Sequence, residues 1–312
     1  MQGVLDMAEA PRATVILPHL NEPDLLSCLR ALDRQRDDNI PFEIIVVDNG
    51  SRLFPADTVA KVAGVKLMHQ PIPGPGPARN MGAATASAPL LLFIDADCLP
   101  MPHWLASIVA FFEQHPEVDI VGGDIGIQPA DPGRLTAVEA YESLYSYRAK
   151  YYVEHHGFAA TGNMAVRAKA FHQIGPFGGI GTMEDTEWGQ RATKAGHAIA
   201  YLPQARVETP SCRSFDELAR RWDRHVAHEF GQVPKSAGAM AGWLAKSVVM
   251  AASPLGEILR ILSTDRLAGA RARLLAFGCL TSVRLYRARR MVSLAWHDNA
   301  ASMVDMWNRE QR

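Results

Sequence analysis

The sequence predicts an α/β protein with a mostly parallel sheet flanked by helices and with a helical C-terminal extension. Three observations lead to this fold class. Short apolar runs alternate with helix-like stretches over residues 13–123, several of these runs end in polar residues, and beyond residue 214 long helical patterns replace the strand-like runs. Continuous apolar strands that alternate with helices are typical of a parallel sheet covered on both faces.

The expected elements follow one another in a regular order. One side of the first expected helix carries four leucines, Leu25, Leu26, Leu29 and Leu32, as in a helix that covers a sheet. A later helix is built mostly of small residues, ARNMGAATASA. We expect strands at 13–20, 42–48, 65–69, 90–95 and 118–123, and helices at 23–36, 55–63, 78–88 and 102–115.

Polar segments follow three of the expected strands. They are 18–22 after the first strand, 48–51 after the second and 95–97 after the fourth. Ligands of open parallel sheets bind outside the carboxyl ends of the strands, so we expect these segments to lie together. The first turn lacks the GxGxxG pattern of a dinucleotide-binding fold, and the glycine-rich segment 74–80 lacks the lysine of a P-loop.

The segment 95–97, Asp-Ala-Asp, has two interpretations. Asp95 and Asp97 end the apolar run LLLFI, where an unpaired buried carboxylate is costly. The strand could simply leave the core into a polar turn, with Asp97 capping the next helix. The two aspartates could instead form a catalytic or metal site, and the segment alone does not decide between these possibilities.

Composition indicates a globular chain of 312 residues, with 48% hydrophobic and 21% charged residues. The net charge of −1 hides an acidic body, with −8 over residues 1–210, and a basic remainder, with +7 over 211–312. A basic region suggests an anionic partner, although a solvated helix surface is the alternative.

The four cysteines show no metal-type spacing, which favours a reduced, cytosolic compartment. We find no signal peptide and no apolar run long enough to span a membrane.

The domain organisation follows from these patterns. We expect a flexible N-terminus at 1–12, one domain at 13–212 and a basic helical extension at 213–312. Ser214 and Glu217 form a capping box at the start of the extension, and one side of its first helix carries Leu218, Trp222, Val226 and Phe230. The segments 240–256 and 271–291 combine apolar residues with lysine and arginine, as helices in a membrane interface do. Packing of these helices on the preceding domain is the alternative.

Taken together, the motifs resemble those of the inverting glycosyltransferases of family 2, which have the GT-A, Rossmann-like fold. The resemblance covers about residues 13–230 and rests on order and spacing, because each segment is weak alone. It implies transfer of a sugar, of the hexosyltransferase type, from a UDP- or GDP-sugar to a hydroxyl group of a glycan or a lipid-linked acceptor. The matching segments are PHLNE (18–22), VVDNGS (46–51), GPARNMGAATASAPLLLFIDAD (76–97), ATGNMAVRAKAFHQIGPF (160–177) and EDTEW (184–188).

The resemblance implies a nucleotide-sugar site. The carboxylates of Glu22 and Asp48 suit ribose hydroxyls and a base N–H group. The alternative for Glu22 is a residue that complements a helix dipole, and the alternative for Arg79 is a surface arginine. The implied residues are Pro18, Glu22, Asp48, Asn49, Arg79, Asn80, Asp95, Gly162 and Asn163.

The resemblance also implies a metal ion and a base. Asp97, with Asp95, matches the DxD motif and would bind Mg²⁺ or Mn²⁺, hard ions that prefer oxygen ligands and neutralise charge on a diphosphate. Asp185 would be the general base, and Glu184 would orient the acceptor or the base. For this pair of acids, complementing a helix dipole is the alternative.

One departure from the family leaves the third metal ligand open. Many relatives have a histidine after the segment that matches 200–210, whereas this chain has Glu208 and Thr209. Glu208 or water could take that place. Four arginines of the following helix could reach the diphosphate, whereas His225 and His228 are better explained as ordinary helix residues. These arginines are Arg213, Arg220, Arg221 and Arg224.

Two other functions stay open from the sequence. The chain could be a non-catalytic nucleotide-sugar-binding protein, although intact Asp97, Glu184 and Asp185 favour an enzyme. A nucleotidyltransferase is less favoured, because PHLNE is not a lysine-bearing, glycine-rich loop. We expect a cytoplasmic location, peripheral on the inner face of the cell membrane, and no nucleic-acid partner.

Overall fold

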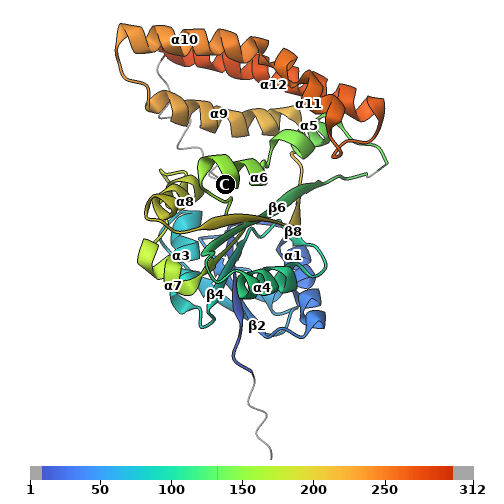
Figure 1. Ribbon diagram of the computed structural model, residues 1–312, viewed down its shortest axis with the longest axis vertical. Helices are drawn as coiled ribbons and strands as arrows, with labels where there is room; N and C mark the ends of the chain where they lie inside the picture. The colour runs from blue at the N-terminus through green and yellow to red at the C-terminus, as the bar shows by residue number, and fades with distance from the viewer. Residues whose placement is uncertain (1–8, 132, 298–312) are drawn as a thin grey trace, which may run out of the picture. The chain divides into compact units, whose positions relative to one another are not determined.

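The computed structural model describes residues 9–131 and 133–297, so most of the expected flexible N-terminus lies outside the described residues. The chain divides into two compact units (Figure 1). The first comprises Met1–Gly126 and Arg148–Thr209, and the second comprises Ile127–Tyr147 and Pro210–Arg312. The expected boundary after residue 212 lies three residues beyond the observed one. The membership of 127–147 in the second unit was not expected from the sequence.

The first unit contains an eight-stranded sheet with the order β3-β2-β1-β4-β7-β6-β8-β5. β3, β2, β1 and β4 pair in parallel, whereas β7 is antiparallel to both β4 and β6, and β5 is antiparallel to β8. The mostly parallel sheet expected from the sequence is therefore confirmed. The strands are β1 (Ala13–His19), β2 (Phe42–Asp48), β3 (Val65–His69), β4 (Leu90–Ile94), β5 (Leu99–Pro100), β6 (Ile120–Gln128), β7 (Asn163–Arg167) and β8 (Ile199–Pro210).

The four helices that the sequence predicts in the first unit are present, whereas the helical elements between residues 149 and 194 were not expected. The helix expected at 55–63 forms only one turn between Pro55 and Gly64, where a φ of 73° turns the chain into β3. The helical elements are α1 (Leu25–Asp33), η1 (Arg34–Asp38), α2 (Ala56–Val59), α3 (Pro75–Thr85), α4 (Trp104–Gln114), α6 (Ala149–Tyr151), η2 (Tyr152–His156), α7 (Ala168–Ile174) and α8 (Glu184–Lys194).

The small residues of α3 let this helix lie close against the sheet. A Cβ atom on Gly82 would overlap the side chain of Ile16 in β1. The helix begins three residues earlier than expected, because Pro75 occupies its first turn and Gly74, at a φ of 122°, turns the chain into it. This close packing brings Arg79 of α3 to the carboxyl ends of the strands.

An aromatic cluster fixes α8 against the sheet. Phe93 of β4, Phe171 of α7, and Phe177 and Trp188 lie with ring centroids 5.2–5.7 Å apart. The Trp188 indole N–H also donates to the carbonyl of Gly175 at 2.8 Å. These contacts anchor α8, whose first two residues are Glu184 and Asp185.

The second unit is helical. α5 was not expected from the sequence, although Thr136 and Glu139 form a full capping box at its start. In α9 the Ser214 cap is confirmed, but the Glu217 carboxylate accepts from the N–H of Arg213 instead of closing a box with Ser214. The elements are α5 (Ala137–Tyr145), α9 (Phe215–Gly231), α10 (Ala237–Ala252), η3 (Ser253–Glu257), α11 (Ile258–Ser263) and α12 (Gly269–His297).

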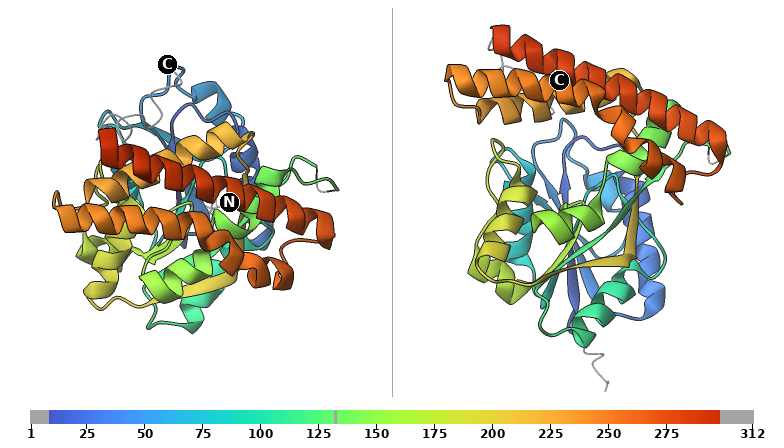
Figure 2. Two further views of the ribbon diagram at one scale, coloured as in Figure 1. Left: turned by 90° about the horizontal axis from the view of Figure 1, so that it is seen from above. Right: turned by 45° about the horizontal axis from the view of Figure 1, so that its top comes forward.

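The expected apolar side of α9 is confirmed. Leu218, Val226 and Phe230 are buried. Trp222 packs against the cluster that contains Leu218, whereas Val226 and Phe230 belong to a second cluster. α10 runs alongside α12, as both views in Figure 2 show. Within the described ranges, none of the helices combines the length and apolar character that crossing a membrane requires.

Candidate active site

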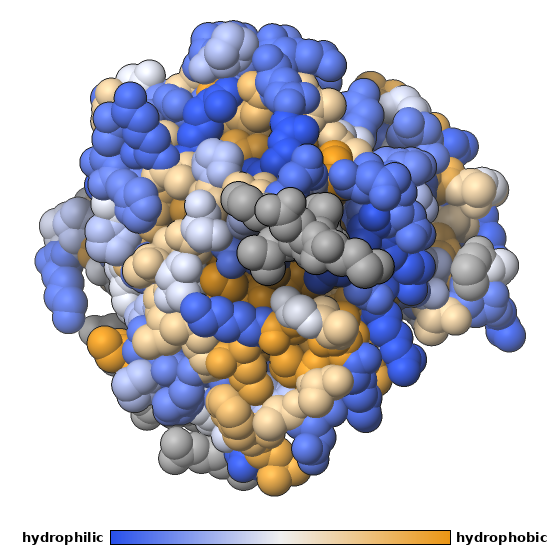
Figure 3. All heavy atoms as spheres, turned by 90° about the horizontal axis from the view of Figure 1, so that it is seen from below, coloured by the Kyte–Doolittle hydropathy of each residue, from blue (hydrophilic) through white to orange (hydrophobic). Residues whose placement is uncertain are grey.

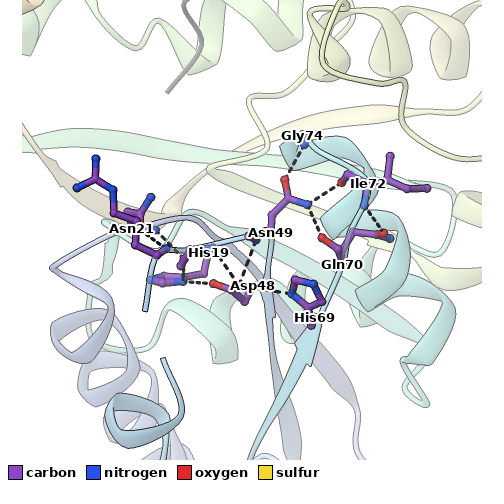
Figure 4. Close-up of polar contacts among 11 residues, drawn as sticks. His19, Asn21, Asp48, Asn49, His69, Gln70, Ile72 and Gly74 are labelled. Carbon is purple, nitrogen blue, oxygen red and sulfur yellow. Dashed lines mark hydrogen bonds and ion pairs between the residues drawn. The ribbon is translucent and has the colours of Figure 1, made fainter. Parts of the chain in front are cut away.

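Asp48, at the end of β2, is fully engaged by its neighbours (Figure 4). Its Oδ1 lies 3.0 Å from Nδ1 of His19, and its Oδ2 accepts the backbone N–H groups of Gly50 and Ser51 at 3.1 Å. Nδ1 of His69 lies 3.6 Å from the same Oδ2. Burial works against ionisation, but the hydrogen bonds from Ser51 and His19 outweigh it and lower the pKa of Asp48. Asp48 is therefore a fixed carboxylate.

Asn49 shapes the loop beside Asp48. Its amide group donates to the carbonyls of Gln70 and Ile72 at 2.9 and 2.7 Å, and its Oδ1 accepts the N–H of Gly74 at 2.6 Å (Figure 4). All of these partners are backbone groups of the segment that leads into α3. The structure thus gives Asn49, expected to bind nucleotide sugar, a role in holding the loop.

Arg79 joins the two acidic motifs. Its Nη2 donates to Asp95 Oδ1 at 2.6 Å and its Nη1 donates to Glu184 Oε1 at 2.9 Å. Only 3% of Arg79 is exposed, which excludes a surface arginine. Burial opposes the charge, but Asp95 and Glu184 outweigh burial and raise the pKa of Arg79. One buried cation therefore links the end of β4 to the start of α8.

Asp97 lies in a cluster of like charges. Burial raises its pKa to about 7, and the nearby carboxylates of Asp95 and Glu22 add to this increase. The capping interpretation is wrong, because β5 follows Asp97 and His103 occupies the N-cap of α4. A cluster of carboxylates that disfavour one another's ionisation is suited to a divalent cation, and the side chain of Asp95 is 44% exposed.

Glu208 does not complete a three-residue metal site. β8 places it opposite Leu99, two residues from Asp97, but its carboxylate lies 3.4 Å from Nη2 of Arg206. In the described parts of the chain, no three His, Cys, Asp or Glu side chains are grouped as a metal site. Among the described residues, Asp97 and Asp95 are the candidate ligands that the sequence predicts, and binding of a metal ion by them stays a prediction.

Asp185 and Glu184 are the first two residues of α8. A helix N-terminus favours a carboxylate, and Oδ1 of Asp185 also accepts the N–H of Thr186 at 2.7 Å. Burial and the charge of Glu184 nevertheless prevail and raise the pKa of Asp185 to about 6. Complementing the dipole therefore does not explain Asp185 by itself, whereas a pKa near 6 suits a general base.

Glu22 and Pro18 lie at the end of β1. Pro18 stands in register with Val47 of β2, and Glu22 Oε1 accepts the N–H of Asp24 at 3.1 Å, just before α1 begins. The charge of Glu22 also reaches Asp97. Glu22 therefore belongs to the acidic cluster and lies near the start of α1, so its dipole interpretation stays open.

Asn80 and Asn163 have their amides occupied by the protein. Asn80 donates to the carbonyl of Phe177 and accepts its N–H, both at 2.9 Å, which ties α3 to the loop before α8. Asn163 is buried, accepts from the Trp104 indole at 2.9 Å and donates to two backbone carbonyls. Both residues hold the framework of the site, and a contact with the nucleotide sugar stays a prediction for them.

Gly162 leaves room for Asp95. A Cβ atom at this position would lie 2.9 Å from Oδ2 of Asp95. No role was expected from the sequence for four residues that surround Asp48 and Asn49, namely His19, Ser51, His69 and Gln70. The first two lie within PHLNE and DNGS, so their motifs gave a signal for them; His69 and Gln70 gave none.

The arginine-rich helix α9 has partners inside the second unit. Arg221 pairs with the buried carboxylate of Glu142 at 2.7 Å. Burial and then the charges of Arg287 and other arginines lower the pKa of His225 to about 4, so this histidine is neutral near pH 7. Delivery of an arginine from α9 to a diphosphate stays a prediction.

The sheet order and the likeness to a solved structure define the class of fold, which is GT-A. Comparison with known proteins then gives the family. The model described as Glycosyl transferase family 2 matches residues 14–175, more than half of the chain, and the chain therefore belongs to this family.

Relatives support the assignment. Glycosyltransferase AglE of Haloferax volcanii is 29% identical over 218 residues, which cover 68% of this chain and 70% of AglE. A pre-mycofactocin glycosyltransferase of Mycobacterium tuberculosis is 26% identical over 304 residues, covering 91% of this chain and 59% of the relative. The mannosyltransferase PcManGT from Pyrobaculum calidifontis, solved in complex with GDP-Man and Mn²⁺, has a TM-score of 0.58 at 18% identity, covering 93% and 88% of the two chains. At this identity the last comparison shows the fold alone.

Proposed function

We propose that the protein transfers a sugar from a nucleoside-diphosphate sugar to a hydroxyl acceptor by direct displacement, with inversion at the anomeric carbon. The observation that carries the proposal is that Arg79 forms two ion pairs, one with Asp95 and one with Glu184. A single buried guanidinium holds Asp95, of the Asp-Ala-Asp segment, and Glu184, beside Asp185. Groups that would bind the donor and a group that would activate the acceptor are thus held next to one another.

The donor nucleoside is proposed to lie at Asp48, with the diphosphate near Asp95 and Asp97. Asp48 stays ionised and can accept a base N–H or ribose hydroxyl. The GDP-Man in the PcManGT complex supports a nucleotide-sugar donor, and both UDP- and GDP-sugars are compatible with a carboxylate acceptor.

Asp97 and Asp95 would hold Mg²⁺ or Mn²⁺ together with oxygens of the donor. The fit rests on the cluster itself, because a cation would offset the repulsion and burial that raise the pKa of Asp97. The Mn²⁺ of PcManGT points the same way. When bound, the ion would neutralise charge on the departing diphosphate.

Asp185 would supply the base. Its carboxylate takes the proton of the acceptor hydroxyl while that oxygen forms its bond to the anomeric carbon, and the bond from this carbon to the diphosphate oxygen breaks. The electron pair of the broken bond leaves with the nucleoside diphosphate. Glu184, fixed by Arg79, keeps the first turn of α8 in place and raises the pKa of Asp185 toward a working value. The proposed acceptor is a glycan or lipid-linked hydroxyl.

The Asp185→Asn variant tests the base, because it keeps the shape and the Thr186 hydrogen bond but removes basicity. Transfer should fall by about 10²–10⁴-fold with little change in donor affinity. In the parent, the rate should fall as pH decreases through about 6, where Asp185 becomes protonated. Full activity in the variant would move the base elsewhere, first to Glu184.

Donor hydrolysis with and without EDTA separates this proposal from its alternatives. Metal-dependent release of nucleoside diphosphate supports a transferase. Binding without turnover would indicate a non-catalytic nucleotide-sugar-binding protein, and release of pyrophosphate would indicate a nucleotidyltransferase.

A further inference from the structure

Exposed apolar side chains are concentrated on the second unit. Of the sixteen large apolar side chains that are exposed among the described residues, ten lie between residues 248 and 296. Contiguous exposed apolar surface on a soluble domain usually marks an interaction site. The ten are Val248, Val249, Leu255, Ile258, Leu259, Leu262, Leu274, Leu285, Val292 and Trp296.

The outward side of α10 and α11 is apolar along its whole length. Trp243 and Ser247 of α10 are buried, so this side of the helix faces the protein. The exposed positions recur every three or four residues, as expected for one helix face, and they continue into η3 and α11. They are Ala241, Ala245, Val248, Val249, Ala252, Leu255, Leu259 and Leu262, and we call this set the apolar stripe. Its leucines are 56–79% exposed.

α12 adds positive charge beside the apolar stripe. Its exposed positions include Arg271 and Arg289 together with Leu274, Leu285 and Trp296, again at helical spacing. Over residues 237–297 the sequence has nine lysines and arginines but only two acids, Glu257 and Asp265. Four of these cations pair with acids inside the second unit, namely Lys246, Arg260, Arg287 and Arg290, whereas Arg271 and Arg289 are exposed. Apolar side chains and cations therefore occupy the same pair of neighbouring helices.

We propose that the apolar stripe, together with the exposed arginines Arg271 and Arg289 of α12, binds the surface of a bilayer that contains anionic lipid. An interfacial helix needs apolar area to bury at the acyl boundary and cations for the headgroups, and both are present. A second copy of this chain fits less well, because it would bring two strongly basic surfaces together. Apolar residues also reach the surface seen from below (Figure 3), so exposure alone does not identify a membrane surface; helical continuity and charge do.

Membrane binding itself does not depend on the proposed function. Only its biological role rests on that function, since a lipid-linked acceptor would be confined to the membrane surface. Vesicle binding and donor binding can be measured separately on the full chain. If the parent binds vesicles but no UDP- or GDP-sugar, the proposed function fails and the membrane surface stands.

Flotation with vesicles of phosphatidylcholine, with and without 30% phosphatidylglycerol, tests the surface directly. The parent should bind the anionic vesicles at low salt, and binding should weaken as NaCl is added, because charges are screened over about 8 Å at physiological ionic strength. If the parent does not bind anionic vesicles at low salt, the proposal is wrong.

The Leu255→Lys/Leu259→Lys variant separates apolar insertion from simple charge attraction. Binding to anionic vesicles should fall by about tenfold or more for each leucine, because each loses the burial of an apolar side chain. Attraction of charge alone would make binding stronger, since two cations are added, and that result would overturn the proposal.

A matched control is Ala84→Lys/Gln114→Lys, which adds the same charge at exposed helix positions of the first unit. Its vesicle binding should not decrease, and thermal unfolding confirms that both variants are folded. If the leucine variant instead converts a dimer into a monomer and leaves vesicle binding unchanged, the apolar stripe is a self-association surface and the proposal is wrong.

Discussion

Asp48 ends β2 and Asp97 lies just beyond β4, two parallel strands of the same sheet, yet their surroundings shift their pKa values in opposite directions. Asp48 receives hydrogen bonds from Gly50, Ser51 and His19, and its pKa is lowered. Burial and the charges of Asp95 and Glu22 raise the pKa of Asp97 to about 7. The ionised carboxylate is stabilised by hydrogen bonds at Asp48, whereas at Asp97 it is destabilised by burial and by neighbouring negative charges.

The difference suggests two roles for these carboxylates, ligand recognition and binding of a cation or a proton. A carboxylate whose partners are already in place can recognise a ligand without changing its own charge. A carboxylate held among other carboxylates gains most from a cation or a proton. Asp185, with a pKa of about 6, belongs with Asp97 in this respect. We therefore predict a recognition region at Asp48 and a reactive region at Asp97 and Asp185.

The largest expected effect comes from removing Asp97. Asp97→Ala should abolish metal-dependent donor binding and lower transfer by about 10³-fold, since a metal that stabilises developing charge contributes several kcal/mol. Calorimetry of donor binding with Mn²⁺ present and absent measures the loss. Asp97→Ala that binds donor as tightly as the parent in Mn²⁺ would show that the metal is held elsewhere.

Arg79 links the two acidic motifs, and its substitution should have the next largest effect. Arg79→Lys keeps the charge but not the two-pronged geometry that reaches Asp95 and Glu184 together. We expect a loss of about 2–4 kcal/mol in the free energy of unfolding, measured in urea, as for a broken buried ion pair.

Arg36→Lys is the matched control for this change. Arg36 pairs with Asp33 at 3.0 Å, and both side chains are exposed. Exposed pairs contribute about 0–1 kcal/mol, so this substitution should change stability little. Equal losses in the two variants would mean that Arg79 does not bridge the motifs in solution.

The fold and the position of the site could be predicted because they depend on local patterns. Apolar runs specify the parallel strands, and strand ends specify where polar segments converge, so Asp48, Asp95 and Asp97 were placed at one edge in advance. The roles of Asn49, Asn80 and Asn163 could not be predicted in this way. An amide in a motif looks the same whether it faces a ligand or a backbone carbonyl, and only the packed structure shows its partners.

The segment 127–147 shows the same limit at the level of domains. Thr136 and Glu139 mark the start of α5 locally, but its membership in the second unit depends on long-range packing against α12. Arg79 is a third case. Its burial follows from the close approach of α3 to β1 at Gly82, which a helix pattern alone does not reveal.

The smallest effects offer the sharpest comparison, because Asp48→Asn and Asp185→Asn should change stability in opposite directions. Asparagine at 48 places an NH₂ group against the donors of Gly50 and Ser51, or against His19, and should cost about 1–3 kcal/mol, as for hydrogen bonds to a charged group. Asparagine at 185 removes a charge that burial and Glu184 disfavour, and should stabilise the fold at pH 7.5 by about 1–3 kcal/mol.

The pH dependence fixes the sign of each effect. The folded-state pKa of Asp185 is raised, so its ionisation costs stability above about pH 6, and this cost disappears as pH falls toward its ordinary value near 4. The stability gained by Asp185→Asn should therefore shrink between pH 7.5 and 4.5.

The folded-state pKa of Asp48 is lowered, so its stabilising contribution is present above about pH 4 and is lost only below it. The cost of Asp48→Asn should accordingly stay constant over the same range. Urea unfolding of the parent and both variants at pH 4.5, 6 and 7.5 measures both trends, and parallel curves for the two variants would remove the distinction between a recognition region and a reactive one.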